Sequence, residues 1–111
     1  MYSDIFDGIV RLRMQKETKK TCPITKTVTL LSDAWTMLIM RALTESPKRF
    51  SELEIWLDGI STRTLTLKLK RLQTEGMLKK SKDGIYSPTK KGMGLQIIEH
   101  AMIKYSKLYL K

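Results

Sequence analysis

Residues 59–87 read GISTRTLTLKLKRLQTEGMLKKSKDGIYS, and this stretch decides the fold. Ser61 is a residue type that is favoured at the N-cap of a helix. Gly76 suits the left-handed conformation that often follows the last helical turn. Between them, three leucines recur at the spacing of one helix face, which predicts a helix from Ser61 to about Glu75 with that face buried. The predicted buried line is Leu65, Leu69 and Leu72.

A hairpin signal follows this helix directly. Residues 77–82 and 85–87 are short strand candidates, and Asp83-Gly84 separates them. An Asp-Gly pair between two such runs is a strong signal for a two-residue type I′ turn. The sequence therefore predicts a small β-hairpin over residues 77–88.

Another helix and an extended stretch are predicted upstream. Asp33 is a favourable N-cap for a helix over residues 34–44. Ser46-Pro47 ends that helix, because the residue before a proline avoids the α region. Shortly after it, Arg49-Phe50 are expected to be extended.

A second short helix then completes a motif. Ser51 is expected to cap a helix over residues 52–57, and Asp58-Gly59 marks a turn after it. Two helices joined by a glycine-containing turn, with a hairpin after the second, are typical of a winged helix-turn-helix. The expected fold class is mainly α with a small β-hairpin (α+β), in a single domain over residues 1–111. The helix-turn-helix is assigned to residues 51–75 and the wing to residues 77–88.

The positive charge of the chain is concentrated in this motif. The net charge is +10, and residues 61–82 alone carry seven basic side chains and one acidic one, a net charge of +6. A localised basic stripe is typical of proteins that bind nucleic acid. A solvated, Lys-rich helix face is the alternative explanation, and charge alone leaves both open.

The helix over residues 61–75 carries residue types that read DNA. The major groove admits one α-helix, and the first residues of that helix reach base edges. Arg63 can pair with guanine, whereas lysines and Arg71 are better suited to phosphates, which position the protein without specifying sequence. On this helix the candidate DNA contacts are Ser61, Thr62, Arg63, Thr64, Thr66, Leu67, Lys68, Lys70 and Arg71. In the wing and its flank they are Arg49, Ser51, Lys79, Lys80 and Lys82.

Composition disfavours other classes of function. One cysteine, one histidine and six scattered glycines cannot supply an internal disulfide, a zinc site, most hydrolase triads or a phosphate-binding loop. We therefore expect no enzyme activity, no metal and no cofactor. The sequence has no apolar run long enough to span a membrane and no signal-peptide pattern at its start, which predicts a cytoplasmic protein without a membrane partner.

Several short runs together resemble a known family. They include Cys22-Pro23-Ile24, Pro47-Lys48-Arg49-Phe50-Ser51-Glu52-Leu53, Gly59-Ile60-Ser61, Glu75-Gly76-Met77-Leu78 and Thr89-Lys90-Lys91-Gly92. Over residues 22–92 the sequence resembles the HxlR-type winged helix-turn-helix regulators, relatives of the MarR group. The resemblance implies a prokaryotic transcription factor that binds double-stranded DNA as a homodimer at an inverted repeat, most often as a repressor.

The resemblance also implies that terminal helices form the dimer interface. Segments 2–20 and 89–111 each carry a broad apolar face that a lone small domain does not need. Thr89 is expected to cap a long final helix that runs to about Leu110. The candidate dimer contacts are Ile5, Phe6, Ile9, Ile98, Met102, Tyr105 and Tyr109.

Three questions stay open at the level of sequence. Cys22 is a candidate redox sensor, because a thiol at a helix start near lysines ionises more readily and some HxlR-type regulators sense oxidants there. The alternative is a small, partly buried structural residue, since free cysteines are often buried. Leu67 either touches a thymine methyl group or packs against the preceding helix. The chain is either a sequence-specific regulator, with a small-molecule or redox effector, or a winged-helix module for non-specific DNA coating or protein–protein assembly.

Overall fold

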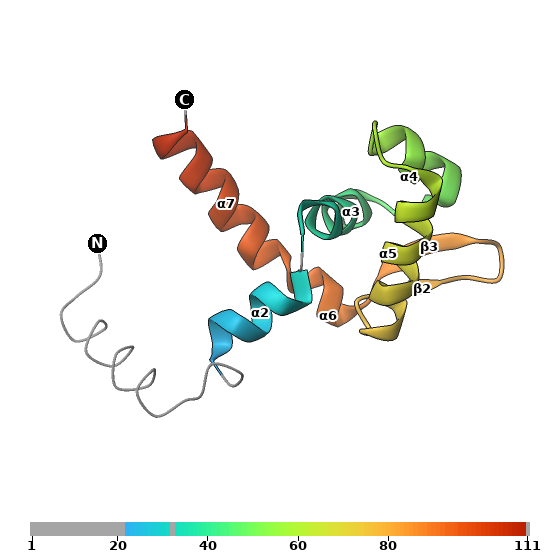
Figure 1. The fold of residues 1–111 in the computed structure, drawn as a ribbon, viewed down its shortest axis with the longest axis horizontal. Coiled ribbons are helices and arrows are strands. Elements are labelled where there is room, and N and C mark those ends of the chain that lie inside the picture. The colour runs from blue at the N-terminus through green and yellow to red at the C-terminus, as the bar shows by residue number, and fades with distance from the viewer. Residues whose placement is uncertain (1–21, 32, 111) are drawn as a thin grey trace. The chain divides into compact units, whose positions relative to one another are not determined.

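The computed structural model describes residues 22–31 and 33–110 (Figure 1). The chain divides into two compact units, Met1–Ser32 and Asp33–Lys111. The dimerisation segment predicted over residues 2–20, and with it the dimer contacts Ile5, Phe6 and Ile9, lies outside the described residues.

The first unit contributes one described helix, α2 (Pro23–Leu31). Pro23 occupies its first position, where the missing N–H removes no helical hydrogen bond. Cys22 precedes it, and its carbonyl oxygen accepts the first helical hydrogen bond from the Lys26 N–H at 2.9 Å. The Ile24 and Val28 side chains of α2 are exposed.

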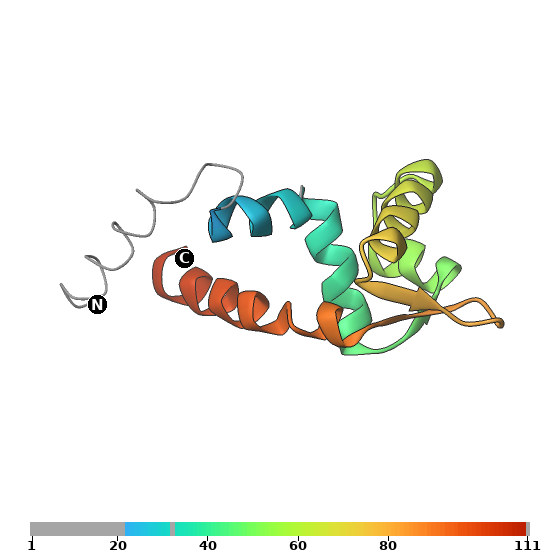
Figure 2. The same cartoon turned by 90° about the horizontal axis from the view of Figure 1, so that it is seen from below.

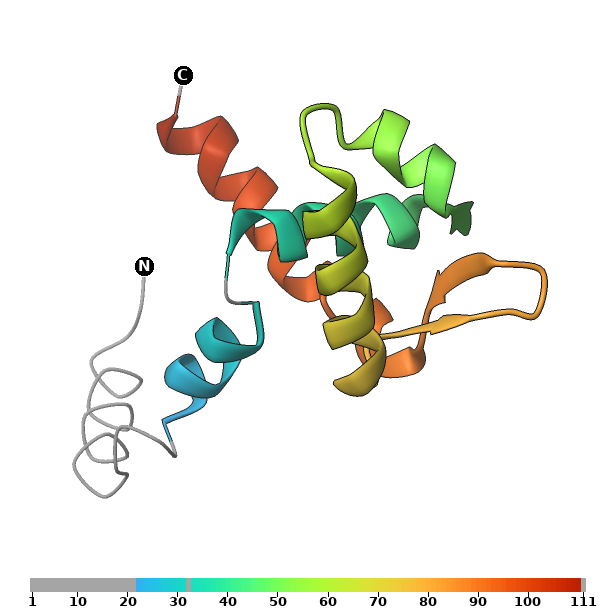
Figure 3. The same cartoon turned by 45° about the vertical axis from the view of Figure 1, so that its right-hand side comes forward.

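The second unit holds all other described elements. In chain order they are α3 (Ala34–Glu45), β1 (Lys48–Arg49), α4 (Phe50–Trp56), α5 (Thr62–Thr74), β2 (Leu78–Lys80), β3 (Ile85–Pro88), α6 (Lys90–Met93) and α7 (Gln96–Tyr109). Helix α7 and the β2–β3 hairpin lie at opposite ends of this unit, with α3 between them (Figure 2). Helix α5 lies across α3 beside the hairpin (Figure 3).

The core of the second unit forms where α5 meets α3. Leu65, Leu69 and Leu72 are at most 2% exposed, which confirms the line predicted from their spacing. Ile39 and Leu43 of α3 are equally buried. Ser61 and Gly76 bound α5 as predicted, because the Ser61 side chain accepts a hydrogen bond from the Thr64 N–H at 3.0 Å and Gly76 has a φ of 74°.

The sheet has three antiparallel strands in the order β1-β3-β2. Lys48 pairs with Tyr86, and Lys79 pairs with Ser87. The extended stretch predicted at Arg49-Phe50 lies one residue earlier, because Phe50 already begins α4. The prediction that Ser51 caps α4 is also wrong: Arg49 is the N-cap residue, and its N–H donates to the Glu52 Oε1 at 2.8 Å.

The hairpin turn differs from the predicted type I′ turn. The Gly84 N–H donates to the Ser81 carbonyl oxygen at 3.0 Å, and the Ser81 N–H donates to the Ile85 carbonyl oxygen at 2.9 Å. Residues 82–84 therefore form a three-residue loop in which Gly84, with a φ of 83°, occupies the left-handed position. The Asp-Gly pair closes the loop as a turn with a bulge, since its glycine comes third and not second.

The final helix predicted as one rod is interrupted. Thr89 caps α6 as expected, because its Oγ1 accepts a hydrogen bond from the Gly92 N–H at 3.2 Å. Gly94 and Leu95 then separate α6 from α7. The Leu95 N–H donates to the Gly92 carbonyl oxygen at 3.1 Å, a three-residue hydrogen bond that tightens the chain at the break.

Gly92 allows α6 to approach the core more closely than any other residue would. A Cβ atom at this position would collide with the carbonyl oxygen of Met77 and lie 2.8 Å from the Met40 Cε. The Met77 oxygen belongs to the backbone between α5 and β2, so it cannot move without displacing both. A glycine is therefore needed here for space, because close packing leaves no room for an added methyl group.

We predict that Gly92→Ala lowers the free energy of unfolding by about 3 kcal/mol, the upper end of the usual cost of overpacking, because the added methyl group meets rigid backbone. Urea unfolding followed by circular dichroism measures the change. Gly94→Ala is the matched control, because the Cβ atom added there would lie 3.2 Å from its nearest neighbour, the Lys91 carbonyl oxygen. Equal losses in the two variants would contradict the close approach at Gly92.

Candidate nucleic-acid interface

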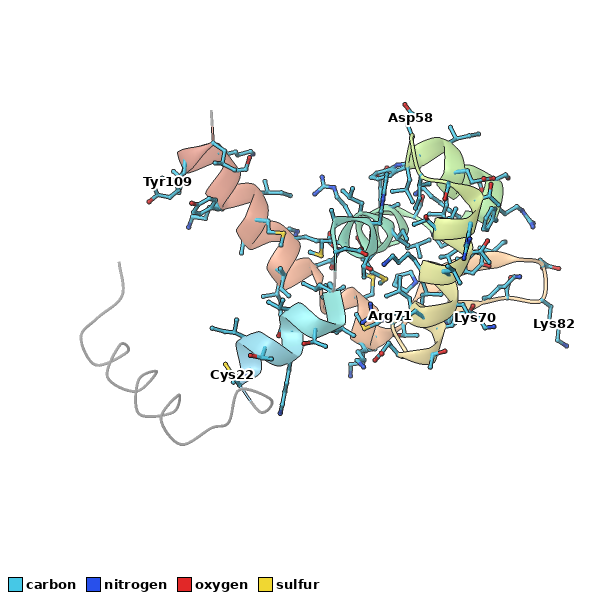
Figure 4. The ribbon with its side chains drawn as sticks, in the orientation of Figure 1. Cys22, Asp58, Lys70, Arg71, Lys82 and Tyr109 are labelled. Carbon is cyan, nitrogen blue, oxygen red and sulfur yellow. The ribbon has the colours of Figure 1, made fainter. Side chains whose placement is uncertain are left out.

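Burial of the leucine line turns the opposite face of α5 toward solvent. Thr62, Arg63, Thr66, Leu67 and Lys70 are exposed on it. Thr64, Lys68 and Arg71 are half-buried beside them, and Ser61 is exposed at the helix start. The structure thus brings all nine candidates on this segment to one region of the surface. Figure 4 places Lys70 on the side of α5 that faces the wing, whose tip carries Lys82.

Several of the hydroxyl groups on α5 are engaged within the protein. The Thr62 Oγ1 donates to the Glu54 Oε2 of α4 at 2.8 Å, which joins the two helices of the motif. The Thr66 Oγ1 donates to the Thr62 carbonyl oxygen at 2.8 Å. The Ser61 Oγ donates to the Thr64 Oγ1 at 2.8 Å. These hydroxyls hold the start of the helix in place.

Lys68 is joined to α3 by an ion pair. Its Nζ donates to the Asp33 Oδ2, while the Asp33 Oδ1 accepts from the Thr36 N–H at 3.0 Å as the N-cap of α3. The hydrogen bond from Lys68, and then that from Thr36, lower the pKa of Asp33 below its ordinary value of 3.8. Asp33 therefore anchors α5 to the start of α3, and the charge of Lys68 is already partly neutralised.

The wing carries its lysines on the outside. Lys79, Lys80 and Lys82 are exposed, and the Lys80 Nζ lies 5.5 Å from the centre of the Tyr86 ring. Arg49 is exposed at the start of α4, and its Nη1 donates to the carbonyl oxygen of Asp83 at the wing tip. Arg49 thus supports the wing. Ser51 is exposed in the first turn of α4.

Lys48 is a buried residue that sequence reasoning missed. Its Nζ donates to the Ala42 carbonyl oxygen at 2.7 Å and to the Ser46 Oγ at 2.8 Å, at the C-terminal end of α3. It also lies 5.7 Å from the centre of the Trp56 ring of α4. The negative end of a helix stabilises a cation, so Lys48 joins α3, β1 and α4 at one point. The pattern of polar and apolar residues in the sequence does not reveal that the Lys48 side chain is buried.

The C-terminal end of α5 is joined to the segment that follows the wing. The Lys91 Nζ donates to the Glu75 carbonyl oxygen at 2.8 Å. The Thr89 Oγ1 donates to the Gly76 carbonyl oxygen at 2.6 Å. Helix α5 is therefore fixed by polar contacts at its start, its middle and its end.

Helix α7 exposes a row of large apolar side chains. Met102, Tyr105 and Tyr109 of the predicted dimer contacts are exposed, and Ile98 is half-buried. The rings of Tyr105 and Tyr109 lie 5.0 Å apart, and Figure 4 shows Tyr109 near the end of α7 that is remote from the wing. Ile97, Leu108 and Leu110 extend the row. An apolar surface of this kind usually marks an interaction site.

Cys22 is 4% exposed and lies at the start of α2. Among residues 22–31 and 33–110, no group of His, Cys, Asp and Glu residues is arranged to hold a metal ion. Within the same described ranges, every helix is too short or too polar to cross a membrane.

The Asp33–Lys68 pair predicts a dependence of stability on pH. Because the folded-state pKa of Asp33 is lowered, the pair stabilises the protein above the ordinary aspartate pKa, and this stabilisation is lost as the pH falls through the lowered value. The two side chains are 38% and 23% exposed, so we expect less than about 1 kcal/mol. Asp33→Asn keeps a capping oxygen but lacks the charge, so it should be less stable than the wild type at neutral pH. The two proteins should become equally stable once the pH is below the lowered pKa of Asp33.

Urea unfolding of both proteins between about pH 6 and about pH 2 measures this difference. The same substitution in a Lys68→Met background is the control. A stability difference that persists unchanged without Lys68 would contradict the role of the ion pair.

Comparison with known proteins places the chain in a family. The sequence profile of the HxlR-like helix-turn-helix family matches residues 30–111. An uncharacterized HTH-type transcriptional regulator of Synechocystis is 35% identical over 101 residues, which cover 86% of this chain and 75% of that protein. The matched region contains the whole second unit of the fold.

Solved structures agree with this assignment. Quinone-bound YodB from Bacillus subtilis is 30% identical, with a TM-score of 0.73 over 80% of this chain and 100% of that one. A MarR-family regulator from Porphyromonas gingivalis is 28% identical, with a TM-score of 0.77 over 86% of this chain and 99% of that one. The expected winged helix-turn-helix fold is confirmed. The chain belongs to the HxlR-like helix-turn-helix family of DNA-binding transcriptional regulators, and it is not an enzyme.

Proposed function

We propose that this regulator is a homodimer that binds a specific inverted-repeat operator and represses transcription. The observation that carries the proposal is the arrangement of the second unit. A basic helix and hairpin lie at one end, and an exposed apolar helix lies at the other (Figure 2). One end is suited to DNA and the other to a second copy of the chain.

Helix α5 acts as the recognition helix in this proposal. Arg63 and Thr66 contact base edges near the helix start, and Lys70 and Arg71 contact phosphates. Lys68 contributes chiefly by positioning the helix through Asp33. Ser51 and the wing lysines contact the backbone or the adjacent minor groove, and Arg49 holds the wing at its tip.

The dimer is formed through α7. Its exposed Met102, Tyr105 and Tyr109 side chains need cover from water, and a twofold axis through them supplies an identical apolar face. Two recognition helices related by this axis read half-sites about 34–36 Å apart, or a multiple of that distance. The contacts predicted for Ile5, Phe6 and Ile9 remain part of the proposed interface.

Selection of random duplexes by the purified, reduced protein, followed by sequencing, tests the function. The proposal expects an inverted repeat that is bound in the presence of excess random DNA. Recovery of no motif, with equal affinity for all duplexes, would overturn sequence-specific regulation. It would favour a module that coats DNA or assembles with proteins. In that case phosphate contacts alone would account for DNA binding, and the logarithm of the binding constant would fall with the logarithm of the salt concentration with a slope of about −0.9 per phosphate contacted.

Arg63 is expected to carry base recognition. Arg63→Ala should weaken operator binding by about 1–3 kcal/mol and relax the preference at one base pair per half-site, because a bidentate contact with guanine is lost. Competition titrations with the selected operator and its base substitutions measure both effects. Lys79→Ala is the control, expected to weaken all duplexes alike. An unchanged base preference in Arg63→Ala would contradict the assignment.

We further propose that oxidants act on this regulator through Cys22. Support comes from its relative YodB, which has been crystallised with bound quinone and after diamide treatment. The thiol lies at the start of a helix, a position that favours the reactive thiolate. Its burial implies a slow reaction, since access limits oxidation.

Diamide should therefore join two subunits through a Cys22 disulfide and release the operator, whereas Cys22→Ser should keep the operator under the same treatment. Non-reducing electrophoresis and DNA titration, each before and after diamide, measure these outcomes. Equal loss of DNA by both proteins would show that Cys22 is not the sensor.

A further inference from the structure

One leucine on α5 departs from the pattern of the others. Leu65, Leu69 and Leu72 are buried, but Leu67 is 57% exposed near the centre of the proposed recognition helix. It lies among hydroxyl and basic side chains on the outer face. An exposed leucine leaves apolar surface in contact with water. Binding to an apolar group of a ligand would remove this surface from water, which is favourable.

Leu67 shares its face with two basic residues. Arg63, Leu67 and Lys70 follow one another at the i, i+4, i+7 spacing, so they form one stripe along the helix. Within the described part of the chain, no hydrogen bond or ion pair engages the Arg63 guanidinium or the Lys70 ammonium group. The stripe is therefore available to a ligand as two cations with an apolar side chain between them.

Packing against the preceding helix, α4, does not bury the Leu67 side chain, because more than half of it is exposed. A surface hollow of about 430 Å³ lies beside it, lined also by Trp35, Thr64 and Arg71. The Leu67 side chain forms one wall of this hollow and is not enclosed by it. Its position on the outer face therefore needs another explanation.

We propose that Leu67 reads the C5-methyl group of a thymine in the operator, an inference that rests on the proposed function and specifies one of its base contacts. In the major groove thymine is the one base of the four that presents a methyl group. A leucine against the amino group of cytosine or adenine would leave a polar group without a partner, which is costly. The contact thus selects for thymine by apolar burial and against other bases by desolvation.

The geometry of a helix also predicts where this thymine lies. Arg63 and Leu67 are four residues apart, a rise of about 6 Å along the helix axis. Successive base pairs are separated by about 3.4 Å. When the helix lies along the groove, the thymine is therefore about two base pairs from the guanine that Arg63 contacts.

Replacing thymine by uracil in the DNA tests the inference without altering the protein. Each thymine of the selected operator is changed to deoxyuridine in turn, which removes one methyl group and keeps base pairing. At one thymine per half-site the wild type should lose about fourfold in affinity, the effect of one buried methyl group. If no deoxyuridine substitution changes the affinity, the inference is wrong.

A Leu67→Ala variant shows whether this residue makes the contact. Its affinity should be nearly the same for the thymine and the deoxyuridine operators, because the apolar partner is gone. Ile55→Ala is the matched control, since Ile55 is an equally apolar exposed residue on α4 outside the stripe, and it should retain the full wild-type difference. A difference that persists in Leu67→Ala, for example through the methyl group of Thr66, would overturn the assignment to Leu67.

The two proposals fail in different ways. An inverted repeat that tolerates deoxyuridine everywhere would leave the specific regulator standing and remove the role of Leu67. Failure to select any motif with the wild type would overturn both.

Discussion

The contact between the leucine line of α5 and the core of α3 is the constraint on which the remaining structure depends. Three leucines on one side of a short helix fix its rotation about its own axis, because turning it would expose them to water at a cost of about 2 kcal/mol or more each. The face opposite is thereby determined as well. The buried leucines do not contact a ligand themselves, but their burial decides which side chains of α5 face a ligand.

Polar contacts then fix what apolar packing leaves adjustable. A leucine line sets the rotation of α5 but allows it to slide along α3, and directional bonds oppose this. Asp33 holds the middle of the helix, Glu54 its start and Lys91 its end. Lys48 does the same for the turn between α3 and α4, where backbone carbonyl oxygens surround its ammonium group. Such contacts add little net stability, but their directionality opposes the sliding of one element along another.

Local signals in the sequence were sufficient for the elements and insufficient for their junctions. The Ser61 and Thr89 caps and the leucine line were predictable because each depends on neighbours within one or two turns. The turn type was not, because an Asp-Gly pair fits a two-residue and a three-residue loop equally well. The Lys68–Asp33 pair was not predictable either, because its partners are 35 positions apart and are brought together only by folding. The exposed face of α5 was predictable, but not that Thr62, Thr66 and Lys68 are already engaged in contacts within the protein.

The hydrogen bond from Arg49 to the carbonyl oxygen of Asp83 constrains the length of the wing. One side chain spans from the strand edge to the hairpin tip, so its reach sets the length of hairpin that can be held. A longer loop would carry the tip beyond that reach and release the guanidinium group. In a winged helix-turn-helix of this kind, we therefore expect an arginine at the position of Arg49 to occur together with a short wing.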